Sequence, residues 1–408
     1  MKILNVAKAA LYGIFLNYYC YYVLNGAFIP RGTMIFFAVA FLCVGLDVLS
    51  ERYIYIGTEF KCWILYTVLS FISTGFILLG SGSSAYISDI IKYAQRLVIT
   101  MMIAYICERE DSIRFGLQLM AVTAVACAVS IIIVTGDIQL KLNITSGADL
   151  SANDIGAIMA FGCFAVTYAW GKKGHASLLL SSVKVTGFIC CMVVIFLAGS
   201  RKSIFAVLIM AAVLLVLCLP EYRRNLSLKK AATVLLVGTV AYWFVAENLL
   251  PYAEQTNLYT RLLGRGAEGT AGSDRDRMLL IRYALEDFAA HPFFGLGFNQ
   301  YDAHHGNYTH CTYVEPLACS GMLGLLYLYP YVSMVQKQLY LIHRSKRGSR
   351  ARVKQKELLA YLAMFLFVGV GIPFMYKDIP CILLGTFIAS QAISFRELRE
   401  KGTLSENY

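Results

Sequence analysis

The chain has 408 residues, of which 58% are hydrophobic and only 15% charged, and its formal net charge is +11. Soluble domains contain roughly 45–50% apolar and about 25% charged residues, so an ordinary soluble protein is excluded. Apolar runs of about 20 residues recur along the chain, long enough to cross a hydrocarbon core of about 30 Å as helices. We therefore predict an all-α, polytopic integral membrane protein and exclude a β-barrel, whose strands alternate over about 10 residues.

The apolar runs predict twelve membrane-spanning helices in a single membrane domain that covers residues 1–408. In chain order the expected spans are 9–28, 33–50, 60–79, 90–107, 114–135, 153–170, 179–198, 203–219, 230–250, 311–336, 357–376 and 379–395. The first span is expected to be retained, because its apolar stretch is too long for a signal peptide and no cleavage site follows it.

Lysine and arginine are distributed unevenly between the two sides of this arrangement. With the N-terminus in the cytoplasm, 24 of the 36 basic residues fall in inner segments. This bias follows the positive-inside rule, and it places both termini in the cytoplasm and residues 251–310 outside. We attribute the net positive charge to topology and to contact with anionic lipid, so no nucleic-acid partner is expected.

The outer turn between the seventh and eighth spans carries two cations, Arg201 and Lys202. Cations on this side oppose the topology signal, which suggests that they serve an anion. The alternative is that both side chains reach the lipid head groups by snorkelling.

The long outer loop, residues 251–310, concentrates polar groups in a chain that is otherwise apolar. Its glycine-rich first part holds Arg265, Arg275 and Arg277, with Arg282 shortly after them. Guanidinium groups offer paired donors that suit phosphate oxygens, and glycines let the backbone approach a ligand closely. These four arginines are therefore candidates for binding a phosphate-bearing substrate.

An amphipathic helix is expected in this loop over about 274–290. Ser273 is placed to cap its start, and the His291–Pro292 pair is placed to end it. Met278, Ile281, Leu285 and Phe288 recur at helical spacing and form an apolar stripe that could rest on the bilayer surface.

Polar residues then gather before the chain re-enters the membrane. Asp302, His304 and His305 come first, and His310 stands at the re-entry point itself. A histidine there titrates near neutrality and can take or give a proton at the mouth of a cavity, although a capping or interface role is the alternative. Adjacent histidines do not readily face one ion, so no metal site is predicted.

The twelve cysteines show no metal-binding spacing. We read them as small packing residues, and we expect no disulfide between Cys311 and Cys319, because eight residues along a helix separate them by about 12 Å.

Three segments resemble the signatures of the O-antigen polymerase and ligase family. They are the turn Gly199–Arg201, the block from Arg277 to Gly297 with its His-Pro and Gly-x-Gly pairs, and the segment from His310 to Gly324. The last contains Tyr313 and Glu315 at the family's Tyr and Glu positions. Cys311, Cys319 and Ile281 depart from the family's usual Asn, Glu and Trp.

The resemblance implies a GT-C-like membrane glycosyltransferase acting on the outer face of the bacterial cytoplasmic membrane. Its donor would be an oligosaccharide carried on undecaprenyl diphosphate, with no nucleotide sugar, metal or other cofactor. The resemblance implies His310 as the catalytic base. The residues that would bind the diphosphate are Arg201, Lys202, Arg265, Arg275, Arg277 and Arg282. Four further residues would position the site or bind the acceptor, namely Tyr313, Glu315, Asp302 and His305. A flippase and a chain-length regulator of the same pathway are the implied partners, beside membrane lipid.

Two functional alternatives remain at this stage. The signature does not separate a polymerase, which we favour for O-antigen, capsule or exopolysaccharide, from a ligase that transfers glycan to the lipid A core. Twelve spans with both ends inside also suit a transporter, but such folds place charges near the membrane midplane, and here the polar residues lie outside.

Overall fold

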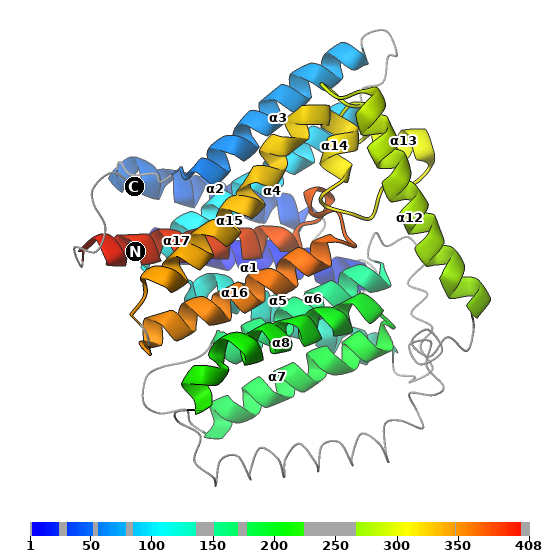
Figure 1. The fold of residues 1–408 in the computed structure, drawn as a ribbon. Helices are drawn as coiled ribbons and strands as arrows, with labels where there is room; N and C mark the ends of the chain where they lie inside the picture. Colours follow the sequence, from blue (N-terminus) through cyan, green and yellow to red (C-terminus); the bar gives the residue numbers. More distant parts are fainter. Residues whose placement is uncertain are drawn as a thin grey trace.

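The structure is a computed structural model that describes residues 2–23, 31–51, 56–78, 85–135, 151–169, 178–223, 267–346 and 348–400. Every regular element within these segments is a helix (Figure 1). Seven of the described helices are long and apolar enough to cross a membrane. The predicted class, an all-α polytopic membrane protein, is confirmed.

The first eight helices overlap the first eight expected spans, although α1 begins seven residues before the expected start and the expected end at residue 28 lies outside the described residues. They are α1 (Lys2–Val23), α2 (Gly32–Glu51), α3 (Thr58–Ile77), α4 (Ala85–Arg109), α5 (Arg114–Thr135), α6 (Ala152–Tyr168), α7 (Leu178–Leu197) and α8 (Arg201–Arg223). The expected span 230–250 lies outside the described residues, as does the first part of the long loop.

The second half of the described chain alternates long and short helices. It contains α12 (Ala267–Ala290), α13 (Gln300–His305), α14 (Glu315–Ser320), the 3-10 turn η2 (Gly321–Leu323), α15 (Gly324–Arg344), α16 (Arg350–Gly369), the 3-10 turn η3 (Phe374–Tyr376) and α17 (Ile379–Glu400). The eleventh expected span, 357–376, is wrong at its end, because α16 stops at Gly369 and η3 follows it.

Helix α17 forms the centre of the bundle and packs against α4, α5 and α15. Its approach to α4 is close, because a Cβ at Gly385 would lie 2.7 Å from the carbonyl oxygen of Thr100. Small residues drive such packing in lipid, where burying apolar surface brings little gain. Large apolar side chains on the outer helices, such as Leu49 on α2 and Val216 on α8, are instead exposed, as expected of surfaces that face lipid.

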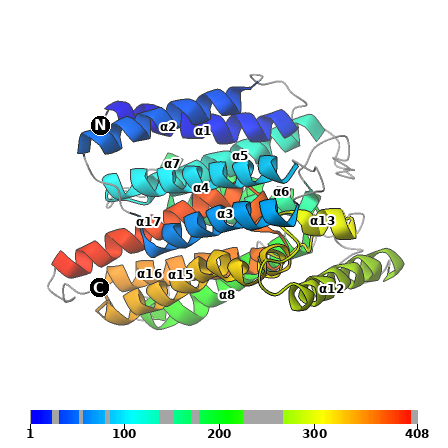
Figure 2. The same cartoon turned by 90° about the horizontal axis from the view of Figure 1, so that it is seen from above.

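Both chain ends lie at one end of the bundle, and α12, α13 and α14 lie at the other (Figures 1 and 2). Helix α12 crosses the axis of the long helices (Figure 1), the orientation expected of a helix at the membrane surface. It begins at Ala267, earlier than the expected 274, so Ser273 lies within the helix and does not cap it. Isolated glycines cost a helix only about 1 kcal/mol each, which lets Gly269 and Gly272 lie within it.

The expected tenth span, 311–336, is broken into α14 and α15. The break lies at Gly321, where φ is +58°, and the turn that follows His291 packs against it. Backbone N–H groups of Leu296 and Gly297 donate to the carbonyls of Ala318 and Cys319, and Met322 donates to Pro292. Two of the family-like motifs therefore contact each other through their main chains.

Replacing Gly295 with alanine is expected to destabilise this contact. Gly295 has φ +66°, and a Cβ there would lie 2.5 Å from backbone atoms of Cys319 and Ser320. Gly306→Ala is the matched control, because Gly306 also has positive φ but has open space around it. Gly295→Ala should lower the free energy of unfolding by about 1–3 kcal/mol more than the control, the typical cost of overpacking. Thermal unfolding of both purified variants tests this difference, and equal stabilities would contradict the close contact.

Candidate active site

His310 lies at the end of the bundle opposite the termini, in a segment fixed on both sides. The N–H of Thr309 donates to Glu315 Oε2 at 2.7 Å, and Thr312 Oγ1 donates to the carbonyl of Ile372 at 2.5 Å. Between these anchors His310 adopts φ +58°, in the left-handed region that few non-glycine residues occupy. Its ring lies 4.2 Å from the ring of Tyr308, centroid to centroid. The backbone at His310 is therefore anchored on both sides, and its ring contacts Tyr308.

Glu315 and Tyr313 hold this segment in place. Glu315 is fully buried at the start of α14, where its carboxylate accepts from Thr309 and, at 3.2 Å, from the hydroxyl of Tyr376. Tyr313 donates through its hydroxyl to the carbonyl of Leu366 on α16. Both side chains are thus used to position the backbone around His310.

Burial and three nearby cations lower the pKa of His310. Burial has the largest effect, followed by the positive charges of Arg277 on α12, Lys202 on α8 and Lys377 beside η3, while Asp154 on α6 opposes them. Together they lower the pKa of His310 to about 4. The imidazole is therefore neutral at pH 7 and has a lone pair available to accept a proton.

Helices α6 and α8 begin side by side next to this segment. Ser200 Oγ donates to Asn153 Oδ1 at 3.5 Å, and a Cβ at Gly156 would overlap Ser200 and Ser203, so glycine is required for the close approach. The helix dipole favours an anion at the start of α8. Arg201 is the first residue of α8, so its charge adds to this effect. The start of α6 is instead closed by a capping box, in which the Ser151 side chain accepts from the N–H of Asp154 and the Asp154 carboxylate accepts from the N–H of Ser151.

Lys202 occupies a defined position against the loop that precedes η3. Its Nζ donates to the carbonyl of Gly371 at 3.1 Å, and a Cβ at Gly371 would overlap the ammonium group. Gly371 therefore leaves the space into which this cation fits.

Gly371→Ala is expected to displace the Lys202 ammonium while leaving the fold intact, because the overlapping atoms are the far end of a flexible side chain. The glycan transfer that the family resemblance implies should fall about tenfold. A hydrogen bond to a charged group contributes roughly 1.5 kcal/mol, and its loss corresponds to about a factor of ten in rate. Gly45→Ala is the control, since nothing lies within 4 Å of a Cβ at Gly45. Normal activity of Gly371→Ala beside a defective Lys202→Ala would show that the position of this ammonium is not critical.

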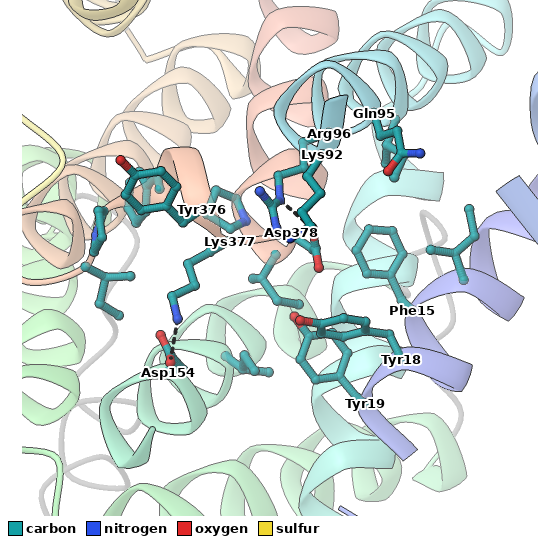
Figure 3. A pocket seen from close by; sticks show the side chains of 18 of the residues that line it. Phe15, Tyr18, Tyr19, Lys92, Gln95, Arg96, Asp154, Tyr376, Lys377 and Asp378 are labelled. Atoms are coloured by element: carbon teal, nitrogen blue, oxygen red, sulfur yellow. Dashed lines mark hydrogen bonds and ion pairs between the residues drawn. The ribbon is translucent and has the colours of Figure 1, made fainter. Parts of the chain in front are cut away.

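A cavity of about 1050 Å³ adjoins the His310 segment (Figure 3). Tyr308, Asp154 and Lys377 line it, so it shares a wall with the surroundings of His310. Asp302, which is exposed on α13, lines its rim. Helices α1, α2, α4 and α6 and the segment from Ile372 to Pro380 form most of the rest of its lining.

The remaining predicted residues do not gather at His310. Arg282 is exposed on α12 and pairs with Glu286 at 2.8 Å, and Arg275 is exposed on the same helix. Arg265 lies outside the described residues. The expected apolar stripe of α12 includes Met278 and Leu285, both exposed, while other residues of the helix pack inward.

His305 links α13 to α12. Its Nε2 lies 2.7 Å from Asp287 Oδ2, and its ring stacks on Tyr283 at 5.3 Å. Together with His304, these two form the group of possible metal-ligating side chains among the described residues, with ligand atoms within 4.8 Å of one another. Sequence spacing could not reveal this group, because Asp287 comes from a different helix. The hydrogen bond and the stacked ring already account for the position of His305.

Several residues of the site were not indicated by the sequence. Lys377 donates to Asp154 Oδ2 at 3.0 Å although 223 residues separate them. Tyr308 and Gly371 are equally unremarkable in the sequence. In the sequence, Asp154 and Lys377 are distinguished only as charged residues near the outer ends of expected spans.

Residues 186–329 match the family model described as O-Antigen ligase. The match covers 144 of the 408 residues, about a third of the chain. This supports the O-antigen ligase and polymerase family suggested by the three motifs, and with it a membrane protein that processes glycans. No curated protein matches the chain.

The segment that matches this family model extends from α7 to the start of α15. It contains Arg201, Lys202, Arg277, His310 and Glu315, whereas Asp154, Lys377 and Gly371 lie outside it. The site is thus completed by α6 and by the loop before α17.

Two departures from the family signature, Cys311 and Cys319, are buried free thiols. Cys319 Sγ lies 3.9 Å from the hydroxyl of Tyr376, which also donates to Glu315. The helical spacing from which no disulfide between them was expected is wrong, because Cys311 precedes α14 and no single helix contains both cysteines.

Proposed function

We propose that this protein polymerises oligosaccharide repeat units carried on undecaprenyl diphosphate, on the outer face of the bacterial cytoplasmic membrane. The observation that carries the proposal is a neutral His310 close to the cations Arg277 and Lys202, within an O-antigen ligase domain. Such a site combines a base for an acceptor hydroxyl with positive charge for a diphosphate leaving group.

The reaction would be a single displacement with inversion. The acceptor oxygen forms a bond to the anomeric carbon of the donor sugar while its proton passes to a ring nitrogen of His310. The bond between that carbon and the diphosphate oxygen breaks, and its electron pair leaves with undecaprenyl diphosphate. Arg201, Lys202 and Arg277 would stabilise the charge that develops on this leaving group.

The outer-face assignment has two supports. The positive-inside bias places both termini in the cytoplasm, and His310 lies in the segment that adjoins α13 and α14, at the end of the bundle opposite the termini (Figures 1 and 2). A chain-length regulator and a flippase of the same pathway would then act with this protein.

A ligase is the second candidate, favoured by the description of the matching family model. The purified protein, supplied only with the lipid-linked repeat unit, separates the two candidates. Chain growth without a lipid A core acceptor supports the polymerase. Transfer that begins only when lipid A core is added supports the ligase, and transport of the lipid without any covalent change would overturn both.

The pH dependence provides an independent prediction. In the free enzyme, His310 with a pKa of about 4 stays neutral down to acidic pH, so kcat/KM should remain flat from pH 8 to about 5. A bound diphosphate adds negative charge beside Arg277, Lys202, Lys377 and Asp154 and so raises the pKa of His310. The acid limb of kcat should therefore lie at higher pH than that of kcat/KM. An acid limb of kcat/KM centred at about 6.5, the ordinary histidine value, would contradict the assigned environment.

A further inference from the structure

The cavity beside His310 has a charge balance that separates it from the diphosphate site. Its three cations each pair with a carboxylate of the same lining. Arg96 pairs with Asp378 at 2.7 Å, Lys377 with Asp154 at 3.0 Å, and Lys92 with Asp89 at 3.3 Å. Asp302 adds a fourth carboxylate. The cavity therefore has no excess positive charge with which to attract a second diphosphate.

These ionic groups also disfavour a polyprenyl chain in the part of the cavity that they line. Hydrocarbon cannot replace the water that hydrates a carboxylate or ammonium group, and such desolvation is costly. The polar amide side chain of Gln95 also lines the cavity (Figure 3). An occupant with many hydroxyl groups avoids this cost, because hydroxyls both donate to carboxylates and accept from cations.

The opposite wall is aromatic. Phe15, Tyr18 and Tyr19 of α1 line the cavity across from the ion pairs (Figure 3), and the rings of Tyr18 and Tyr19 lie 5.0 Å apart. The electron-rich face of an aromatic ring attracts the slightly positive C–H groups on the face of a sugar. Aromatic faces on one side and hydrogen-bonding groups on the other form a combination that suits sugar rings.

The position of the cavity relative to His310 identifies which substrate it would hold. Tyr308 lines the cavity and contacts His310, whereas Arg277 and Lys202 are not part of the lining. Tyr308 thus connects the cavity with His310, and neither of these two cations lines the cavity. We propose that the cavity binds the uncharged sugar rings of the acceptor and presents a hydroxyl to His310, an inference that rests on the proposed function. Its volume, about 1050 Å³, is at the upper end of the roughly 300–1,000 Å³ of ligand pockets, and suits an oligosaccharide.

Two probes separate the cavity from the diphosphate site in the full-length protein. The first is the oligosaccharide released by mild acid from the lipid-linked glycan of cells that lack this protein. It has no phosphate and cannot act as a donor. The second is undecaprenyl diphosphate, which has no sugar. Binding of each probe would be measured to the wild type and to Tyr18→Ala, Tyr12→Ala and Arg277→Ala.

Tyr18→Ala should weaken binding of the oligosaccharide about tenfold, the value of one good aromatic contact, and change binding of undecaprenyl diphosphate less than about twofold. Arg277→Ala should give the reverse pattern. Tyr12 lies on the same helix but outside the cavity, against Phe115, so Tyr12→Ala should leave both affinities unchanged.

The inference would be overturned if the free oligosaccharide did not bind the wild type, or if Tyr18→Ala left its affinity unchanged. Equal weakening of both probes by Tyr18→Ala would also overturn it, because the cavity would then hold the carrier lipid. The proposed function would fail separately if the wild type bound neither probe.

Discussion

Replacing His310 with alanine is expected to lower glycan transfer by about 10²–10⁴-fold, the usual contribution of a general base. The neutral imidazole is the group assigned to take the acceptor proton, and its position is fixed by the anchors at Thr309 and Thr312. Transfer would be followed with purified protein and the lipid-linked repeat unit. Binding of undecaprenyl diphosphate should change little, because the cations remain.

A second substitution removes an ambiguity in this experiment. His310 has φ +58°, so alanine introduces backbone strain as well as removing the base. Asparagine tolerates this conformation better and cannot serve as a base, so His310→Asn should be equally inactive but better folded. His304→Ala, at an exposed histidine of α13, is the control and should remain active. Near-normal transfer by His310→Asn would show that the base is another group.

Arg277→Ala is expected to lower kcat for transfer by about 10²–10³-fold. This is the usual effect of removing one preorganised group that stabilises charge in the transition state. Arg277 is the strongest of the positive charges that lower the pKa of His310, which places it close to the reacting atoms. Its removal should also raise the pKa of His310, so the acid limb of the pH profile should move to higher pH. A purely structural arginine would not produce that second change.

Two other arginines provide control variants for this experiment. Arg282→Ala on the same helix should cost far less, because Arg282 is exposed and pairs with Glu286. Arg344→Ala, which removes a cation from the other end of α15, should have no effect on transfer. Arg277→Lys should recover part of the activity, since it keeps the charge but loses the paired donors. Equal defects in Arg277→Ala and Arg282→Ala would exclude a specific role for Arg277.

The sequence by itself determined the class of the protein, most of its helices and the motifs around its site. Long apolar runs can form only helices in lipid, because each backbone N–H and C=O must be satisfied within the segment. The sequence also indicates His310, Arg201 and Arg277 as candidate site residues, because polar groups in such a chain are few and concentrated near the ends of spans.

The tertiary structure alone decided which of these groups meet. In a membrane protein all spans are apolar, so hydrophobic patterning does not indicate which helices are neighbours, and small residues such as Gly156 and Gly385 determine how closely they pack. The pairing of Lys377 with Asp154 and the break at Gly321 both follow from contacts between segments that are distant in the chain. The spacing of residues along the sequence does not indicate which distant segments meet.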